Sequence, residues 1–469
     1  GQKKSEFDKV FSAWDILVIA FGAMIGWGWV VSSGTWIDAG GVVGAALAFA
    51  LGGVMIFFVG LTYAELTAAM PQCGGEHVFS YKAMGATGSF ICTWAIVLGY
   101  VGVTCFEACA FPTIITYLWP GFLKGYLYTV AGFDIYASWL IVAIIVAFCI
   151  MLINIVGAKT AAKLQTILTV IIGGAGILLI VASVINGTVD NLDGQMFAEV
   201  GGGGIVKSIL SVVLAVLFYA FVIIAVGLVM NAGAITASQA GTGLVTADAM
   251  ALAFKTSVMA KVIIVGGMCG IITSWNSFMI GGSRAIYSMA ESYMIPRVFA
   301  KLHPKHKTPI NALILIGILT MLAPFAGRVM MVWICDAGNF GCCLAYCMVA
   351  ISFLILRKKQ PDMPRPYKVP AGRLMGGVAV LMSGFMVVMY CIPGSGGTLI
   401  LPEWGMVAAW SALGVVFFAI CKSKYRESFG SMIQLISDED AATLLPEADE
   451  RELDKVIDGA IDRVLARLA

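Results

Sequence analysis

The stretch DILVIAFGAMIGWGWVVSSGTWIDAGG, residues 15–41, determines how this chain is interpreted. It is apolar and long enough to span a membrane, yet Gly22, Gly26 and Gly28 lie near its midpoint, with Trp27 between the last two. In lipid, backbone N–H and C=O groups must be paired, so an unwound stretch survives at mid-depth only where it lines a cavity inside the protein. The sequence therefore predicts a helix broken at its centre, and the break is the first candidate for a binding site.

The composition is that of a protein that crosses a membrane many times. Of 469 residues, 60% are hydrophobic and 12% are charged, and the mean hydropathy is +0.94. A soluble core cannot bury that much apolar surface. A spanning helix needs about 20 mostly apolar residues, and such runs occur near 12–37, 41–70, 86–119, 137–157, 160–186, 205–230, 256–292, 308–325, 328–356, 374–393 and 403–421. We expect an all-α polytopic membrane protein with one transmembrane domain over 1–426 and a cytoplasmic, amphipathic tail over 427–469.

Several other classes of protein are disfavoured by the composition. The first apolar run follows three lysines and lacks a small-residue cleavage pattern, so it is expected to remain a membrane helix and not to act as a signal peptide. Most of the twelve cysteines lie inside apolar runs without partner histidines, which favours packing over a disulfide or a metal site. His77, His303 and His306 fall in loops. No resident cofactor or metal is expected, and a net charge of +2 does not point to nucleic acid.

The basic residues predict the orientation of the chain, because Lys and Arg gather in short cytoplasmic loops. Lysines before the first run, after the second run and after the fourth run all fall on one side, which places the N-terminus inside. The loop after the fifth run carries Asp190, Asp193 and Glu199 against Lys207 alone, and it is expected outside. We therefore expect a multi-pass protein of the cell membrane with both termini in the cytoplasm.

The same argument then fails at residues 205–230. If this run crosses once, the basic loops at 297–307 and 357–373 fall outside, against the positive-inside rule. One more crossing would restore both loops, yet 26 residues at 1.5 Å per residue span roughly 39 Å, enough for a single passage. We therefore predict that a segment is absent between about Tyr219 and Ile224, and that twelve helices is the natural count. A single continuous helix through 219–224 would refute this prediction.

Four stretches together resemble the amino acid, polyamine and organocation (APC) transporters over most of the chain, up to about residue 426. They are GAMIGWG at 22–28, YAELTAAMPQCGGEHVFSY at 63–81, SRAIYSMAESYMIPRVFAKLHPKHKTPINA at 283–312 and LRKKQPDMPRPYKVP at 356–370. The resemblance implies the leucine-transporter fold, with two inverted repeats of five helices plus two more helices. In that fold helices one and six are broken at the midplane, and sites lie between the repeats.

The resemblance also implies where a substrate would bind. The glycine-rich break of helix one, here Ile25, Gly26, Trp27 and Gly28, would bind a carboxylate through freed N–H groups, although glycines also serve close helix packing. Helix six would supply carbonyl oxygens for an amine and aromatic rings over the ligand, and the candidates are Phe218, Tyr219 and Phe221. Tyr100, Trp275 and Asn276 could face the same cavity or could be ordinary packing residues.

Ionisable residues inside membrane spans are costly, so each suggests a function. Glu107 and Asp336 could hold a substrate ammonium or relay a proton, or each could be paired structurally. Glu65, Asp15 and Arg284 lie near the cytoplasmic ends of their helices, where gating or structural roles are favoured over substrate contact.

The coupling ion remains open at this point. Proton-coupled relatives carry a lysine in helix five, and here that position is Ile172 or Gly173, so a lysine mechanism should not be transferred. Thr273 and Ser274 could supply hydroxyl ligands for sodium, and exchange or facilitated transport without an ion is equally open.

The sequence thus predicts a secondary transporter for an amino acid or a closely related amine, embedded in lipid and with no enzymatic activity. The alternative within transport is a polyamine or organocation carrier or exchanger, favoured if both Glu107 and Asp336 face the cavity. A channel fits an aromatic-plugged break poorly. A membrane enzyme would need an H-E-x-x-H or G-x-S-x-G pattern, and the sequence has neither.

Overall fold

The computed structural model describes most of the transmembrane part of the chain. It covers residues 20–26, 28–31, 33–130, 133–192, 195–196, 216–240, 244–327, 329–394, 397–426 and 429–430. The amphipathic tail predicted over 427–469 and the lysines before the first helix lie almost entirely outside these ranges.

Eight helices of the described part are long and apolar enough to cross a membrane. They are α4 (Val42–Ala69), α5 (Glu76–Leu118), α6 (Ala137–Val156), α7 (Ala158–Asn186), α12 (Val258–Glu291), α14 (Val329–Lys359), α15 (Gly372–Cys391) and α16 (Leu401–Tyr425). Each matches an apolar run of the sequence. Helix α5 is longer than its apolar run because it includes the residues before Gly85. Gly85, with φ of 76°, interrupts the helix, and the part after Gly85 forms the expected span.

Shorter elements join the spans. The helices are α2 (Gly28–Val31), α3 (Ser33–Gly40), α9 (Val216–Val229), α10 (Ala232–Ala240), α11 (Val245–Phe254) and α13 (Ile310–Leu322). The 3-10 turns are η1 (Pro120–Phe122), η2 (Val189–Leu192), η3 (Arg297–Ala300) and η4 (Ala323–Ala326). A small antiparallel hairpin, β1 (Tyr126–Val130) and β2 (Phe133–Tyr136), pairs Val130 with Phe133 before α6 begins.

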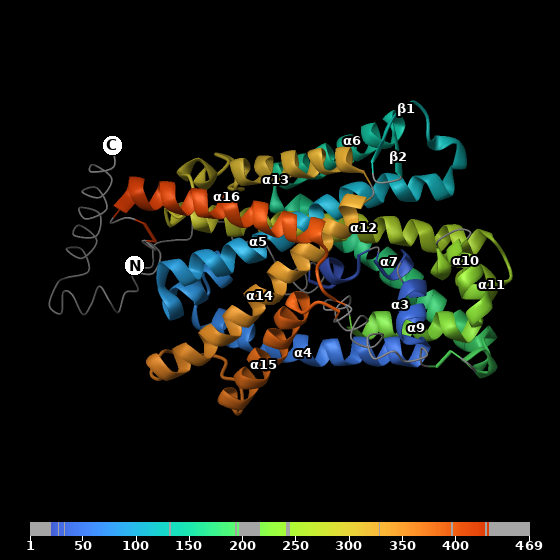
Figure 1. Cartoon of the computed structure of the whole chain (residues 1–469), viewed down its shortest axis with the longest axis horizontal. Helices are drawn as coiled ribbons and strands as arrows, with labels where there is room; N and C mark the ends of the chain where they lie inside the picture. Colours follow the sequence, from blue (N-terminus) through green and yellow to red (C-terminus); the bar gives the residue numbers. More distant parts are fainter. Residues whose placement is uncertain are drawn as a thin grey trace.

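The long helices form one bundle around α5 (Figure 1). This helix packs against α14 and α12 within the bundle, and α12 packs in turn against α7. The outer helices expose apolar side chains: Leu381 on α15 is 73% exposed and Val415 on α16 is 67% exposed. Such surface is stable only in lipid, so the chain is a multi-pass membrane protein.

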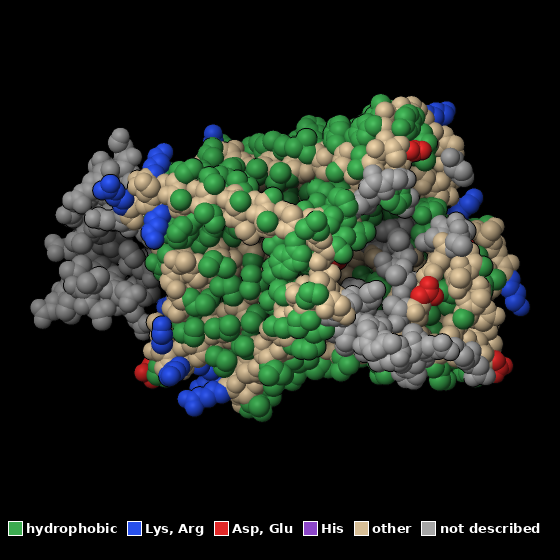
Figure 2. Space-filling view, in the orientation of Figure 1, with side chains coloured by type: hydrophobic (Ala, Val, Ile, Leu, Met, Phe, Trp, Pro, Cys, Tyr) green, Lys and Arg blue, Asp and Glu red, His purple; other side chains and the backbone are tan. Residues whose placement is uncertain are grey.

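The basic loops gather at one end of the bundle, as the sequence predicts (Figure 2). The hydroxyl of Thr308, after the loop at 297–307, donates to the carbonyl oxygen of Ile155 at 2.9 Å. Lys359, at the end of α14, lies 3.5 Å from the carbonyl oxygen of Ala83. The hairpin and α10 lie at the opposite end (Figure 1). Loops that follow the second, fourth, seventh and ninth apolar runs therefore share one side of the membrane.

The prediction of an absent segment between Tyr219 and Ile224 is wrong by its own criterion, because α9 is continuous from Val216 to Val229. The position of the basic loops on one side of the membrane has a different explanation in the structure. The amide N–H of Thr188 donates to the carbonyl oxygen of Leu228 at 2.9 Å. The side-chain amide of Gln195 donates to the carbonyl oxygen of Met230, also at 2.9 Å. The end of α9 thus lies at the same end of the bundle as Thr188 and Gln195.

The expected midplane break of helix six is also not found in α9. The bend that follows, 108° between α9 and α10, falls at residues 230–231, beside Gln195 at the end opposite the basic loops. Because the carbonyl oxygens within α9 are used by its own helix, they are not free to accept from an amine.

Candidate functional site

The first helix is broken where its glycines predict. Residues 20–24 are helical, Ile25 and Gly26 are not, and α2 begins at Gly28. The last bond of the inner half runs from the amide N–H of Ile25 to the carbonyl oxygen of Phe21, at 3.0 Å. Trp27 lies outside the described residues. The break leaves backbone groups near Gly26 without the partners that a continuous helix would provide.

Tyr219 on α9 pairs with one of these groups. Its hydroxyl donates to the carbonyl oxygen of Met24 at 2.9 Å, and Gly28 would supply that partner in a continuous helix. The Tyr219 ring packs 5.6 Å from the Trp36 ring and 5.4 Å from the Phe49 ring, measured between centroids. The tyrosine therefore fixes the end of the inner half-helix from an aromatic cluster, a role that the sequence does not reveal.

The break packs against α12 at a second glycine. A β-carbon placed on Gly270 would lie 3.0 Å from the carbonyl oxygen of Gly26, and it would overlap the side chain of Ile172. Only glycine allows this approach without displacing a neighbour. Ile172 of α7 therefore also lies beside the break.

Glu107 on α5 lies beside the break. A β-carbon on Gly26 would be 3.2 Å from its Oε1 atom and 3.4 Å from the Ser274 hydroxyl. The Glu107 side chain is 2% exposed, and its Oε2 atom has no hydrogen-bond partner in the part of the chain that the structure describes. Its one polar neighbour on α12 is Ser274, within hydrogen-bonding reach. An unpaired buried carboxyl is costly, so this group needs a proton or a cation.

Two threonines hold the surroundings of the break. Thr273 donates its hydroxyl to the carbonyl oxygen of Gly270 at 2.9 Å, so its oxygen can still accept or coordinate. On α11, Thr246 lies 2.9 Å from the carbonyl oxygens of Trp29 and Val30 and from the Ser33 hydroxyl. Thr246 was not a sequence candidate, because a single threonine in a short helix carries no recognisable signal.

Polar side chains of α7 face the inner half of the first helix. A β-carbon on Gly22 would lie 2.6 Å from the Thr169 hydroxyl and would overlap the Gln165 amide. Both side chains are buried, and the Gln165 Nε2 and Thr169 Oγ1 atoms have no partner among the described residues. The sequence did not single out this pair, although its i, i+4 spacing continues to Ile172 on one helix face.

Other predicted residues are not brought to the break. The Asn276 amide belongs to a network between helices, with Asn154 at 2.9 Å and Gln165 at 3.0 Å. Tyr100 packs 5.8 Å from the Phe278 ring and against Gly282, between α5 and α12. The expectation that these two face the site is not met, because polar and aromatic groups pair with neighbouring helices instead.

Two further expectations need correction. Phe221 is 55% exposed on α9, pointing away from the core, because successive α9 residues face different sides of the helix. Asp336 on α14 lies within hydrogen-bonding reach of Glu403 on α16, and this carboxyl pair is separate from the break.

Trp275 is fully buried in the main core. Phe218 lies in α9, but its side chain is outside what the structure describes.

Comparison with known families identifies the chain. Residues 15–207 match one amino acid permease model and residues 207–419 match a second. This chain belongs to the amino acid permease family. Three curated proteins of Bacillus subtilis show the range of its relatives, each 24% identical to this permease. They are a branched-chain amino acid permease (80% of this chain, 87% of that protein), a methylthioribose transporter (90% and 95%) and an aspartate-proton symporter (82% and 80%).

Proposed function

We propose that this permease is a secondary transporter that moves an amino acid, or a closely related amine, by alternating access. Family membership and relatives that are named as permeases, transporters and symporters support transport over enzymatic activity. The observation that carries the proposal is the unpartnered Glu107 carboxyl oxygen beside the unwound backbone at Gly26. Free N–H groups and a carboxylate at one place are complementary to the two ends of a zwitterion.

The roles follow from charge. The N–H groups of Gly26, Trp27 and Gly28 would bind the substrate carboxylate, since backbone N–H groups at a helix end carry partial positive charge. The fourth candidate, Ile25, already donates its N–H to the carbonyl oxygen of Phe21. Glu107 would take the ammonium group, in place of the carbonyl oxygens expected from a broken helix six. This division supports an amino acid over a diamine, because Glu107 is the one carboxylate that meets the break among the residues that the structure describes.

This geometry does not support the runner-up, a polyamine or organocation carrier. It required both Glu107 and Asp336 at the cavity, and Asp336 lies beside Glu403 instead. A diamine would also leave the N–H groups at Gly26 without a negative partner.

Three modes of coupling fit the site. A sodium ion would be held by the Thr273 and Ser274 oxygens together with carbonyl oxygens of the first helix, a ligand set that suits a hard cation. A proton would be carried by Glu107 itself. Exchange would need neither ion, and the lysine-based mode has no residue here because Ile172 faces the break.

Orientation is part of the proposal. The end that carries the loops at 297–307 and 357–373 would face the cytoplasm, with both termini there and the hairpin outside, in the cell membrane. The inner half of the first helix, held against Thr169 and Gln165, would then close the path to the cytoplasm.

A ligand screen tests the proposal directly. The purified protein is heated with each amino acid and with amines, with and without sodium and at two pH values, because a ligand that binds only the native state raises the unfolding midpoint. We expect stabilisation by at least one amino acid, together with saturable counterflow of that compound in proteoliposomes. Uptake without counterflow would indicate a channel, and stabilisation by diamines alone would restore the runner-up.

A further inference from the structure

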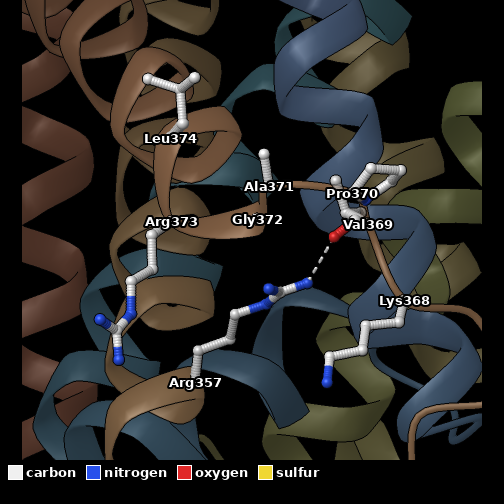
Figure 3. Close-up of a pocket in the computed structure, with 8 residues that line it drawn as sticks. All are labelled: Arg357, Lys368, Val369, Pro370, Ala371, Gly372, Arg373 and Leu374. Atoms are coloured by element: carbon white, nitrogen blue, oxygen red, sulfur yellow. Dashed lines mark hydrogen bonds between the residues drawn. The ribbon is translucent and has the colours of Figure 1, made fainter.

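A cavity of about 640 Å³ lies between the end of α14 and the start of α15. Three cationic residues, Arg357, Lys368 and Arg373, and the first backbone turn of α15 line it, as Figure 3 shows. Its size is within the range of small-molecule sites. It lies at the basic end of the bundle, far along the chain from the break at Gly26, and the proposed transport function does not use it.

Two residues that line the cavity, Arg357 and Val369, belong to a buried ionic cluster with unequal charges. The Glu65 carboxylate, 1% exposed, accepts from Arg357 Nε at 3.0 Å and from its Nη2, and Arg365 Nε lies 3.1 Å away. The amide N–H of Val369 donates to the same carboxylate at 2.7 Å. Two guanidinium groups thus share one carboxylate, which leaves a net positive charge in a poorly hydrated place.

The Arg357 side chain is aimed so that part of it remains available. Its Nη2 atom also donates to the carbonyl oxygen of Val369 at 2.9 Å, and its guanidinium lies 4.9 Å from the Phe353 ring centroid. No hydrogen bond is found for its Nη1 atom within the described residues. A β-carbon on Gly372 would overlap the guanidinium, so the charge lies directly against the first residue of α15.

The remaining groups at the cavity are donors or cations. Lys368 and Arg373 are exposed, and neither has an ion pair in the described part of the chain. The N–H groups of Gly372 and Arg373, the first two of the 20-residue helix α15, have no partner within their own helix, whereas that of Leu374 donates to the carbonyl oxygen of Ala371 at 2.8 Å. Arg365 faces inward, where it donates to carbonyl oxygens of Gln360 and Met363 and shapes the linker. The one acidic residue of the linker, Asp362, is exposed and makes no ion pair among these residues.

We propose that this cavity binds the phosphate group of an anionic phospholipid from the leaflet at the basic end. Guanidinium, ammonium and helix N–H groups are the donors that phosphate prefers. The cavity lies where one spanning helix ends and the next begins, which is the depth of lipid headgroups. The positive-inside rule explains how many basic residues the linker carries, but it does not explain their convergence on one cavity.

The consequence is structural as well as electrostatic. A phosphate here would balance the surplus guanidinium and would tie α4, α14 and the start of α15 together through Arg357 and Glu65. We therefore expect phosphatidylglycerol to raise the unfolding midpoint of the protein relative to phosphatidylcholine alone.

The test compares two double variants of equal charge change. Lys368→Gln with Arg373→Gln removes cations of the cavity, whereas Lys301→Gln with Lys305→Gln removes two exposed lysines from the loop after α12 at the same end. Each protein is placed in phosphatidylcholine nanodiscs with increasing phosphatidylglycerol, and the half-saturating fraction is read from thermal unfolding. Salt of about 1 M shortens the Debye length to about 3 Å and removes diffuse attraction.

We expect the cavity variant to need about thirtyfold more phosphatidylglycerol, since each basic residue contributes about 1 kcal/mol near anionic lipid. The loop variant should match the wild type. Equal losses in both variants, or no stabilisation of the wild type by phosphatidylglycerol, would overturn the proposal.

Inorganic phosphate added to phosphatidylcholine nanodiscs distinguishes the source: if it reproduces the full shift, the ligand is a free phosphate compound and the lipid assignment is wrong. Native mass spectrometry of the wild type should retain phosphatidylglycerol selectively.

Discussion

Replacement of Glu107 by Gln is the sharpest test of the proposed site. The change keeps the size of the side chain and removes the charge that lies beside Gly26. If a substrate ammonium pairs with this buried carboxylate, truncating the pair costs about 2–5 kcal/mol, which corresponds to a loss in affinity of roughly thirtyfold to several thousandfold.

The same substitution should not weaken the empty protein. The Glu107 carboxyl is 2% exposed and one of its oxygens has no partner among the described residues, so the native state gains little from its charge. We therefore expect an unfolding midpoint equal to or above that of the wild type, measured by differential scanning fluorimetry without ligand. Loss of binding together with retained stability distinguishes a ligand contact from a folding defect.

Asp336→Asn is the matched control. It removes a carboxylate at a comparable place in the membrane, but its neighbour is Glu403 and not the break. Titration with the amino acid found in the screen should give wild-type affinity for this variant, within about twofold. The reasoning fails if Glu107→Gln binds and exchanges that amino acid as the wild type does, or if Asp336→Asn loses as much affinity.

Three further substitutions test the framework of the site. Gly270→Ala should lower ligand affinity about tenfold or more, because overpacking against the Gly26 carbonyl costs about 1–3 kcal/mol; Gly174→Ala, where a β-carbon meets open space, should bind normally in the same titration. Tyr219→Phe should lower the free energy of unfolding by about 0.5–1.5 kcal/mol, because the Met24 carbonyl oxygen loses the hydroxyl that donates to it, and an unchanged denaturation midpoint would contradict this. Glu65→Gln should destabilise by about 3–5 kcal/mol in the same assay, because two guanidinium groups then lack their carboxylate.

The break in the first helix could be predicted from sequence, because its signal is local. Gly22, Gly26 and Gly28 within one membrane-length run indicate a broken helix whatever the rest of the chain does. Glu107 could also be identified as a candidate from sequence, since an acidic residue inside an apolar run is costly and usually has a functional or structural role. Its position beside Ser274 and Gly26 could not be predicted from sequence, because this position depends on the rotation of α5 and α12 about their axes.

Residues on other helices were predicted less well for the same reason. Asn276 and Ser274 are two positions apart on α12, so they point to different sides of the helix. One meets the break, and the other joins Asn154 and Gln165. Periodicity alone cannot decide which side faces the cavity when nearly every side of a central helix is buried.

The charge argument at residues 205–230 shows what a sequence rule can and cannot decide. Counting basic loops correctly required an even number of crossings between Met196 and Met230, and the hydrogen bonds from Gln195 and Thr188 to the end of α9 agree. The inference of an absent segment added an assumption, that an apolar run of membrane length crosses the membrane. An apolar helix can instead pack inside the protein, as the described part of α9 does where the Tyr219 ring lies against Trp36 and Phe49.

The same assumption explains why the sequence prediction placed the amine end of the site on helix six, whereas our proposal places it at Glu107 of α5. A broken helix six would offer free carbonyl oxygens, and these could accept from an ammonium without any acidic residue. A continuous α9 offers only side chains, and Tyr219 already donates its hydroxyl to Met24. In our proposal the cation-binding role then passes to Glu107, the carboxylate that meets the break within the described residues. The affinity of this permease for its substrate should therefore depend on Glu107 far more than a site built from carbonyl oxygens would allow. That dependence is what the paired titrations of Glu107→Gln and Asp336→Asn measure.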